Sequence, residues 1–380
     1  MDRIYRSPVK YGALFGAGVV LVMALIGFLR WWNTPLGTEL ALATGTPPRK
    51  TSPPPPPETL IPGTQQAESE VSSSGRETPA AETPTPTPTP AAETARTPEP
   101  MCGGPDTLYL LVTGVDSGNY IYGLSDAIRI IRVDFVEGKV TVLPLPRDLY
   151  VSISVQVPGL DQSYVQGKLN QAYFYGSPGM GYYDQPDGGP GLLARTLGEN
   201  FNLRVDRYLS VNTRIFRRMV EEVGGVNVYL PENVYGHHFN EPVLYLEAGQ
   251  HHLTGKQAEM VARHRTLIGD FGRVKNQTIL LKAFVRKLLT PQGIKEVPAL
   301  IDIYREDVLM DFTPNQISKL LCLAGKIDLG EDITFLNFPQ EILTEGRVYA
   351  EANQAEVYAL TYDQEQVRQL LADFQAGDWP

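Results

Sequence analysis

The chain has 380 residues, a formal net charge of −10 at pH 7 and two cysteines. This acidic balance disfavours a protein that binds nucleic acid, because such proteins usually present positive charge to the phosphate backbone. The chain is long enough to bury a substantial hydrophobic core. Its composition changes sharply along the sequence, which divides it into an apolar N-terminal stretch, a proline-rich stretch and a part that is expected to fold.

The apolar stretch covers residues 11–29 and contains no charged side chain. A helix of this length can cross the hydrocarbon core of a bilayer. Three basic residues precede it and a single arginine follows closely, which by the positive-inside rule places the N-terminus in the cytoplasm. We expect a cytoplasmic tail at 1–10 and a single-pass cell-membrane anchor at 11–32, with the rest of the chain outside the cytoplasm. A secretory signal cleaved near 41–43 is the alternative, but the apolar run is long for a signal peptide.

Residues 33–105 are rich in proline, serine and threonine. Five consecutive prolines occupy 53–57, and threonine alternates with proline over 83–90. Such a sequence buries too little apolar surface to fold, so it stays disordered or forms polyproline II helix. We expect a linker that separates the folded part from the membrane within a thick extracellular layer.

The remaining chain alternates short apolar runs with helical patterns, which predicts an α/β fold. We expect a three-layer α/β/α domain on a mixed central sheet at 106–290, with a C-terminal extension at 291–380 that completes or flanks it. The predicted strands include 107–115, 127–136 and 139–145, and the first is expected to be central because it is almost entirely apolar. The predicted helices include 190–201, 212–223, 254–265, 271–289, 313–324 and 363–374.

The two cysteines, Cys102 and Cys322, both lie in the part that is expected outside the cytoplasm. A disulfide can persist in that environment. A bridge would fasten the end of the linker to a C-terminal helix, and two unpaired thiols are the alternative.

Charged residues lie at the ends of the predicted strands. Asp116 follows the first strand, and Asp126 directly precedes the second. Arg147 and Asp148 follow the third. Ligands of α/β sheets bind beside the carboxyl ends of strands, carboxylates suit Mg²⁺ or Mn²⁺, and arginines bind phosphate, so this set indicates phosphoryl transfer. Taken singly, an aspartate in a loop more often caps a turn, and an Arg-Asp pair more often forms a surface ion pair.

A second basic cluster lies further along the chain, where Arg263, Arg265 and Arg273 fall within eleven residues. Gly269 and Asp270 lie between the last two, so we expect a sharp turn, with Asp270 as the N-cap of the helix that follows. A helix start offers free N–H groups, and guanidinium groups match phosphate oxygens. The cluster predicts a phosphate site, and the alternative is a helical corner with a surface salt-bridge network.

Together these residues form an ordered set of motifs that resembles the LytR-CpsA-Psr family. The resemblance runs from about residue 107 to residue 289, and it extends to the order of membrane anchor, linker and folded domain. The motifs are Gly114-Val115-Asp116, Ser125-Asp126, Pro146-Arg147-Asp148, Lys168-Leu169-Asn170-Gln171-Ala172-Tyr173, Gly224-Gly225-Val226, and Arg263-His264-Arg265 with Gly269-Asp270-Phe271-Gly272-Arg273.

The resemblance implies a membrane-anchored phosphotransferase with a layered α/β/α fold. Members attach glycopolymers carried on polyprenyl pyrophosphate to the cell wall, usually to a hydroxyl group of peptidoglycan. It implies that Asp116 and Asp126 hold a divalent metal, Mg²⁺ or Mn²⁺, and that these two act in catalysis with Arg147, Arg265 and Arg273. The residues that it implies for pyrophosphate binding are Arg147, Arg263, Arg265, Arg273 and Gln277.

Two positions depart from the family pattern. Leu124 and Asn276 stand where the family commonly has arginine, and Arg129, Arg132 or Lys275 could compensate. Two other functions therefore stay open. One is a pyrophosphatase that acts on the same lipid with water as the acceptor, and the other is a non-catalytic module that binds or regulates polyprenyl lipids or wall polymers.

Overall fold

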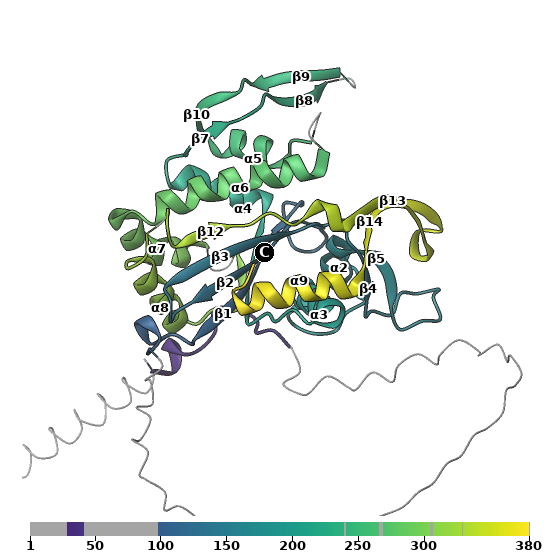
Figure 1. Ribbon diagram of the computed structural model, residues 1–380, viewed down its shortest axis with the longest axis horizontal. Coiled ribbons are helices and arrows are strands. Elements are labelled where there is room, and N and C mark those ends of the chain that lie inside the picture. Colours follow the sequence, from purple (N-terminus) through teal and green to yellow (C-terminus); the bar gives the residue numbers. More distant parts are fainter. Residues whose placement is uncertain are drawn as a thin grey trace, which may run out of the picture. The chain divides into compact units, whose positions relative to one another are not determined.

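The computed structural model describes residues 29–41, 98–238, 241–265, 269–304, 307–328 and 330–379 (Figure 1). A six-stranded mixed sheet forms its centre. In spatial order the strands are β11 (Leu309–Met310), β6 (Arg207–Asn212), β1 (Thr107–Val115), β2 (Ser125–Asp134), β3 (Lys139–Leu145) and β12 (Ile333–Phe335). β1 pairs antiparallel with β2 and parallel with β6, which confirms the predicted mixed α/β fold.

β1 is a central strand whose side chains are buried on both faces of the sheet. Leu111 and its neighbour Ile130 on β2 belong to the core on one face. Leu110 belongs to the core on the other face, together with Val133 of β2. A strand that is buried on both sides reads as a nearly continuous apolar run, and this is why the sequence identifies it.

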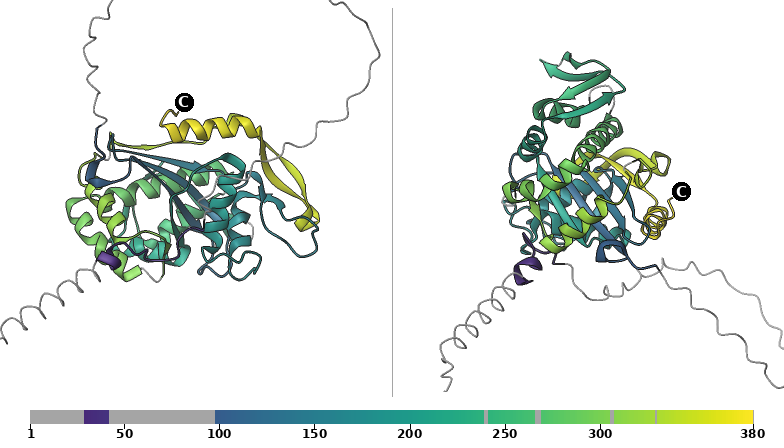
Figure 2. Two further views of the ribbon diagram at one scale, coloured as in Figure 1. Left: turned by 90° about the horizontal axis from the view of Figure 1, so that it is seen from below. Right: turned by 90° about the vertical axis from the view of Figure 1, so that its left-hand side faces the viewer.

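Helices cover both faces of the sheet (Figures 1 and 2). The helices packed on the first core are α2 (Leu169–Gly176), α3 (Gly188–Phe201) and α9 (Gln364–Ala376). Those that contribute to the second core are α4 (Thr213–Glu222), α7 (Pro291–Tyr304) and α8 (Pro314–Ala324). A third core joins α4 to α5 (Gly255–Arg263), α6 (Gly269–Leu288) and the strand pair β7 (Val226–Leu230) and β10 (Gly249–Leu253).

The C-terminal part completes the central sheet, because β11 and β12 are its two edge strands. It also contains the hairpin β13 (Leu343–Ala350) and β14 (Ala355–Tyr362), which the sequence does not predict. Most of β13 is exposed, so its sequence lacks the apolar alternation that marks a half-buried strand. The other short elements are η1 (Met101–Gly103), β4 (Tyr150–Ile153), β5 (Val165–Lys168), β8 (Val234–His238), β9 (Glu241–Leu246), η2 (Gln340–Ile342) and η3 (Glu351–Asn353).

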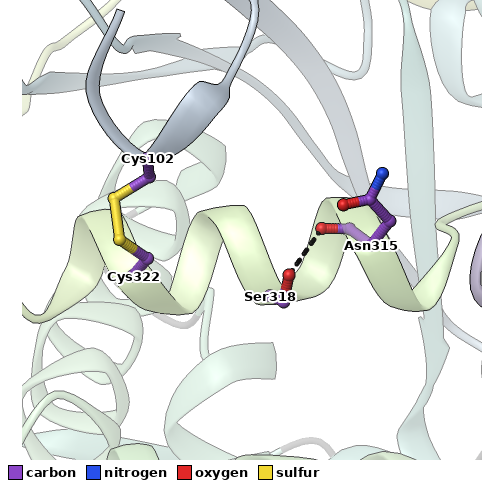
Figure 3. Close-up of a disulfide and its surroundings, with 4 residues drawn as sticks. All are labelled: Cys102, Asn315, Ser318 and Cys322. Carbon is purple, nitrogen blue, oxygen red and sulfur yellow. Dashed lines mark hydrogen bonds between the residues drawn. A yellow bond between two sulfur atoms is a disulfide. The ribbon is translucent and has the colours of Figure 1, made fainter.

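A disulfide joins Cys102 to Cys322, with an S–S distance of 2.02 Å (Figure 3). Cys102 lies in η1, directly before β1, and Cys322 lies on α8. The bridge spans 220 residues of sequence and ties the entry of the first strand to a helix of the C-terminal part. The structure therefore contains the paired form of the two alternatives that the sequence leaves open.

Residues 36–41, which the sequence assigns to the linker, pack on the folded unit. The Leu36 amide donates to the Phe312 carbonyl at 2.8 Å, and Tyr208 Oη donates to the Thr38 carbonyl at 2.7 Å. The Ala41 amide donates to Asp187 Oδ2 at 2.7 Å. The side chains of Leu36 and Leu40 pack against the second and the first core, respectively. We call residues 36–41 the docking segment.

The expected membrane anchor at 11–32 and most of the expected linker lie outside the described residues. In the part of the chain that the structure describes, no helix is both long enough and apolar enough to span a membrane.

The docking segment yields a prediction at Gly37, because a Cβ atom there would overlap with the Met310 carbonyl oxygen. We expect Gly37→Ala to release residues 36–41 and to speed amide hydrogen exchange of a peptide covering 33–41 by about tenfold or more. Gly346→Ala is the matched control, since a Cβ at Gly346 meets no atom within 4 Å. Equal exchange in both variants would contradict the docking contact.

Candidate functional site

Four charged side chains form a closed ring near the end of β1. Arg147 donates a short hydrogen bond to Asp126 Oδ1, and Arg273 Nη1 lies 3.2 Å from Asp126 Oδ2. Both arginines also reach Asp270 Oδ1, at 3.2 Å from Arg147 Nε and 2.7 Å from Arg273 Nη2. Each arginine thus bridges the same two carboxylates. We call this cluster the Asp–Arg ring.

Three separate elements position the Asp–Arg ring. Asp126 is the second residue of β2, Arg147 follows β3, and Asp270 and Arg273 lie in the first two turns of α6. Gly269 has φ +67°, a conformation that favours glycine, at the start of this helix. The prediction that Asp270 is an N-cap is wrong: α6 begins at Gly269, and Asp270 instead pairs with Arg273 one turn later.

Two residues of the predicted motif at 168–173 contact the ring or a neighbour of the ring. Lys168 Nζ lies 2.8 Å from Asp148 Oδ1, and Asp148 is buried beside Arg147. Asn170 Nδ2 donates to Asp126 Oδ1 at 3.2 Å. These contacts hold Asp126 and Arg147 in a fixed orientation, a role that the sequence alone does not assign to Lys168 or Asn170.

The charges of the ring shift the pKa values of its members. Burial would raise the pKa of the Asp126 carboxyl, but Arg147 and Arg273 and the hydrogen bonds of Arg147 and Asn170 outweigh it and hold the pKa below its usual value. Burial lowers the pKa of Arg147, yet the neighbouring carboxylates raise it above its usual value. The pKa of Arg273 is lowered by burial and by the charge of Arg147. Further negative charge would therefore stabilise ionised Arg273.

An apolar cavity opens beside the ring, between the sheet and helices α4 and α6. Phe216, Leu280 and Phe284 are among the apolar side chains that line it. Charged and polar side chains line it as well, and two of them, Asp126 and Arg273, belong to the Asp–Arg ring. The polar lining residues are Thr113, Asp116, Asp126, Arg129, Asn212, Thr213, Glu259, Arg263, Arg265, Arg273 and Gln277.

A polar groove lies on the other side of the same ring. Arg147, Asp148 and Asp270 line it, and Tyr358 of β14 contributes an aromatic wall. Lys168 Nζ lies 5.5 Å from the centre of the Tyr358 ring, within range of a cation–π contact. Arg265 lines both the groove and the apolar cavity, so the two hollows meet at the charged cluster.

The structure brings most of the residues that the sequence selects to this one place. Asp126, Arg147 and Arg273 belong to the ring, and all the selected side chains except Arg147 line the apolar cavity. Arg263 and Arg265 are exposed, and Arg263, whose side chain is 61% exposed, pairs with Glu259. Gln277 Nε2 donates to the Ala262 carbonyl at 3.2 Å. The selected residues on the cavity wall are Asp116, Asp126, Arg263, Arg265, Arg273 and Gln277.

A divalent cation could be held by Asp116 and Asp126, which face the same cavity. Asp116 Oδ1 accepts a hydrogen bond from the Leu124 amide, and both oxygens of Asp126 contact arginines. Among the described residues no cluster of three or more acidic, cysteine or histidine side chains forms a complete metal cage. Carboxylate oxygens are the type of ligand that Mg²⁺ takes, commonly one or two carboxylates with phosphate oxygens and water completing its coordination.

Asp126 yields a prediction about the pH dependence of stability. Because its folded pKa is lowered, ionised Asp126 stabilises the fold above its unfolded pKa, near 4, and this contribution is lost as the pH falls through the folded pKa. We expect Asp126→Asn to lower the free energy of unfolding by about 1–3 kcal/mol at pH 7 and by progressively less below pH ~4. Urea unfolding at several pH values measures this, with exposed Asp161→Asn as the control. A difference that stays constant down to pH ~2 would contradict the assignment.

The LytR_cpsA_psr family model matches residues 69–371 of this chain. The polyisoprenyl-teichoic acid–peptidoglycan teichoic acid transferase TagU of Oceanobacillus iheyensis is 30% identical over 221 residues, which cover 57% of this chain and 62% of that protein. Regulatory protein MsrR of Staphylococcus aureus is 28% identical over 197 residues, 52% of this chain and 54% of that protein. The chain thus spans less than two thirds of the length of these relatives.

The crystal structure of TagV from B. subtilis shares the fold. It superposes with a TM-score of 0.54 at 22% sequence identity and covers 72% of this chain and 98% of that chain.

Proposed function

This chain belongs to the LytR_cpsA_psr family, and we propose that it transfers a glycopolymer from a polyprenyl pyrophosphate carrier to a hydroxyl group of peptidoglycan. The observation that carries this proposal is the position of the Asp–Arg ring between an apolar cavity and a polar groove. A polyprenyl pyrophosphate-linked glycopolymer has three matching parts: an apolar tail for the cavity, a charged pyrophosphate for the ring and a polar sugar chain for the groove. The transferase name of the relative from Oceanobacillus iheyensis supports the same reaction.

In this proposal the prenyl chain enters the apolar cavity and the pyrophosphate lies against Arg147, Arg265 and Arg273. The arginines bind the phosphate oxygens and stabilise the negative charge that develops during transfer. Asp116 and Asp126 would hold Mg²⁺ or Mn²⁺, which supplies further charge stabilisation at the pyrophosphate.

The reaction replaces a phosphoanhydride bond of the pyrophosphate with a phosphate ester bond to the acceptor. The acceptor hydroxyl oxygen attacks the phosphorus that carries the sugar, and the bond from this phosphorus to the bridging oxygen breaks. Polyprenyl phosphate leaves with the electron pair, and the hydroxyl proton passes to a nearby carboxylate. Asp148 lines the groove from which a sugar acceptor would approach, and Asp116 lines the cavity on the other side.

We further propose that the chain works on the outer side of the cell membrane, anchored through residues 11–32. The charge-free apolar run supports the anchor, and the Cys102–Cys322 disulfide supports an oxidising compartment.

Binding of farnesyl pyrophosphate to the detergent-solubilised full chain tests the site. We expect EDTA to weaken binding, and Arg265→Ala/Arg273→Ala to weaken it by about 100-fold, because two charge-assisted hydrogen-bonding groups are removed. Arg347→Ala is the control, since this arginine lies on the exposed hairpin, where it pairs with Glu356. Circular dichroism checks that each variant folds.

Product analysis with a lipid-linked glycopolymer and peptidoglycan separates the possible activities. Polymer joined to peptidoglycan is the expected product. Free polymer phosphate would identify a pyrophosphatase instead, and binding without any product would identify a non-catalytic module. No binding by the wild type under any condition would overturn the proposal.

A further inference from the structure

Arg129 is a buried arginine that the mechanism above does not use. It lies in the middle of β2, where it is 5% exposed, and it lines the apolar cavity beside Arg273 and Gln277. A charged side chain at this depth normally has an oppositely charged partner, because transfer of an unpaired charge out of water is costly.

The surroundings of Arg129 supply no such partner. Among the described residues no carboxylate lies within ion-pair distance of it, and its Nε has no hydrogen-bond partner. Its remaining contacts are long and go to neutral groups, at 3.5 Å from Nη1 to Gln277 Oε1 and 3.4 Å from Nη2 to Thr278 Oγ1. Burial and the charge of Arg273 lower its pKa to about 10, so it remains protonated at neutral pH.

Arg132, three residues further along the same strand, shows how a structural arginine is satisfied in this fold. Its Nη2 lies 2.9 Å from Asp134 Oδ2, and its Nε donates to the Gln375 carbonyl at 3.2 Å. The two arginines therefore differ in their partners. Arg132 has an oppositely charged partner in the folded chain, whereas Arg129 has none and could bind an anion.

We propose that Arg129, which reaches the cavity from β2 of the central sheet, binds the pyrophosphate of the donor. This inference rests on the proposed function, because the anion that enters the cavity is the lipid pyrophosphate. Arg129 would thus supply positive charge that Leu124 and Asn276 do not. Together with Arg273, which lines the same cavity, it would bind the phosphate.

The proposal makes an unusual prediction for the ligand-free protein. Arg129→Met removes an unpaired buried charge, so the melting temperature of this variant without ligand should equal or exceed that of the wild type. Its affinity for farnesyl pyrophosphate should fall by at least about tenfold, and the ligand should no longer raise its melting temperature as much as in the wild type. Arg129→Lys keeps the charge with fewer donors and should bind with intermediate affinity.

Arg132→Met is the matched control in the same strand. It breaks a paired contact, so we expect a lower melting temperature and unchanged affinity. Thermal unfolding and equilibrium binding of all four full-length proteins, with farnesyl pyrophosphate, inorganic pyrophosphate and farnesol as probes, measure these effects. The loss in Arg129→Met should be present with both pyrophosphates and absent with farnesol.

The outcomes are distinguishable. If the wild type binds farnesyl pyrophosphate and Arg129→Met binds it equally well, the role of Arg129 is overturned while the proposed function stands. A variant Arg129→Met that unfolds or melts well below the wild type would also overturn it, because the arginine would then be structural. If the wild type binds no pyrophosphate, both proposals fail.

Discussion

Two arginines that bridge the same two carboxylates hold β2, β3 and α6 together at one end of the sheet. Arg147 and Arg273 each contact Asp126 and Asp270, so none of the four charges is left alone in the partly buried site. The start of α6 is thereby fixed against the strands. Because α6 also forms one wall of the apolar cavity, the same ion pairs determine the shape of the hollow beside them. Loss of a single member would leave an uncompensated charge, which costs more than the pair contributes.

A balanced ring of charges suits the proposed reaction for a physical reason. Phosphate oxygens compete with carboxylates for the same guanidinium groups, so an incoming pyrophosphate can take over contacts that are already oriented. When the arginines bind the ligand, they neutralise less of the Asp126 charge. A cation at Asp116 and Asp126 would then balance that charge. The charge of the site would stay nearly balanced through this exchange of partners.

The sequence predicts the fold and the neighbourhood of the site where patterns are strong. β1 is recognisable because both of its faces are buried, and Asp116, Asp126 and Arg147 are recognisable because they stand at strand ends. The role of Asp270 is not, since capping and ion pairing place the same side chain at a helix start. Most of β13 is exposed and shows no apolar period, so the hairpin that carries Tyr358 could not be predicted or placed beside the groove. The docking segment is held partly by hydrogen bonds of its backbone, which leave no signature in residue type, and its two packed leucines are too few to form a recognisable apolar period.

The docking segment places contacts with the folded unit on the N-terminal side of the proline-rich sequence. The chain contacts the folded unit at residues 36–41 and belongs to it again from Glu99 onward. Along the chain, residues 43–98 thus join two parts of one compact unit. Their number can change without moving the sheet relative to residue 36. The distance between the sheet and the N-terminal apolar run is instead limited by the few residues between Arg30 and Leu36, a span of about 20 Å even when fully extended.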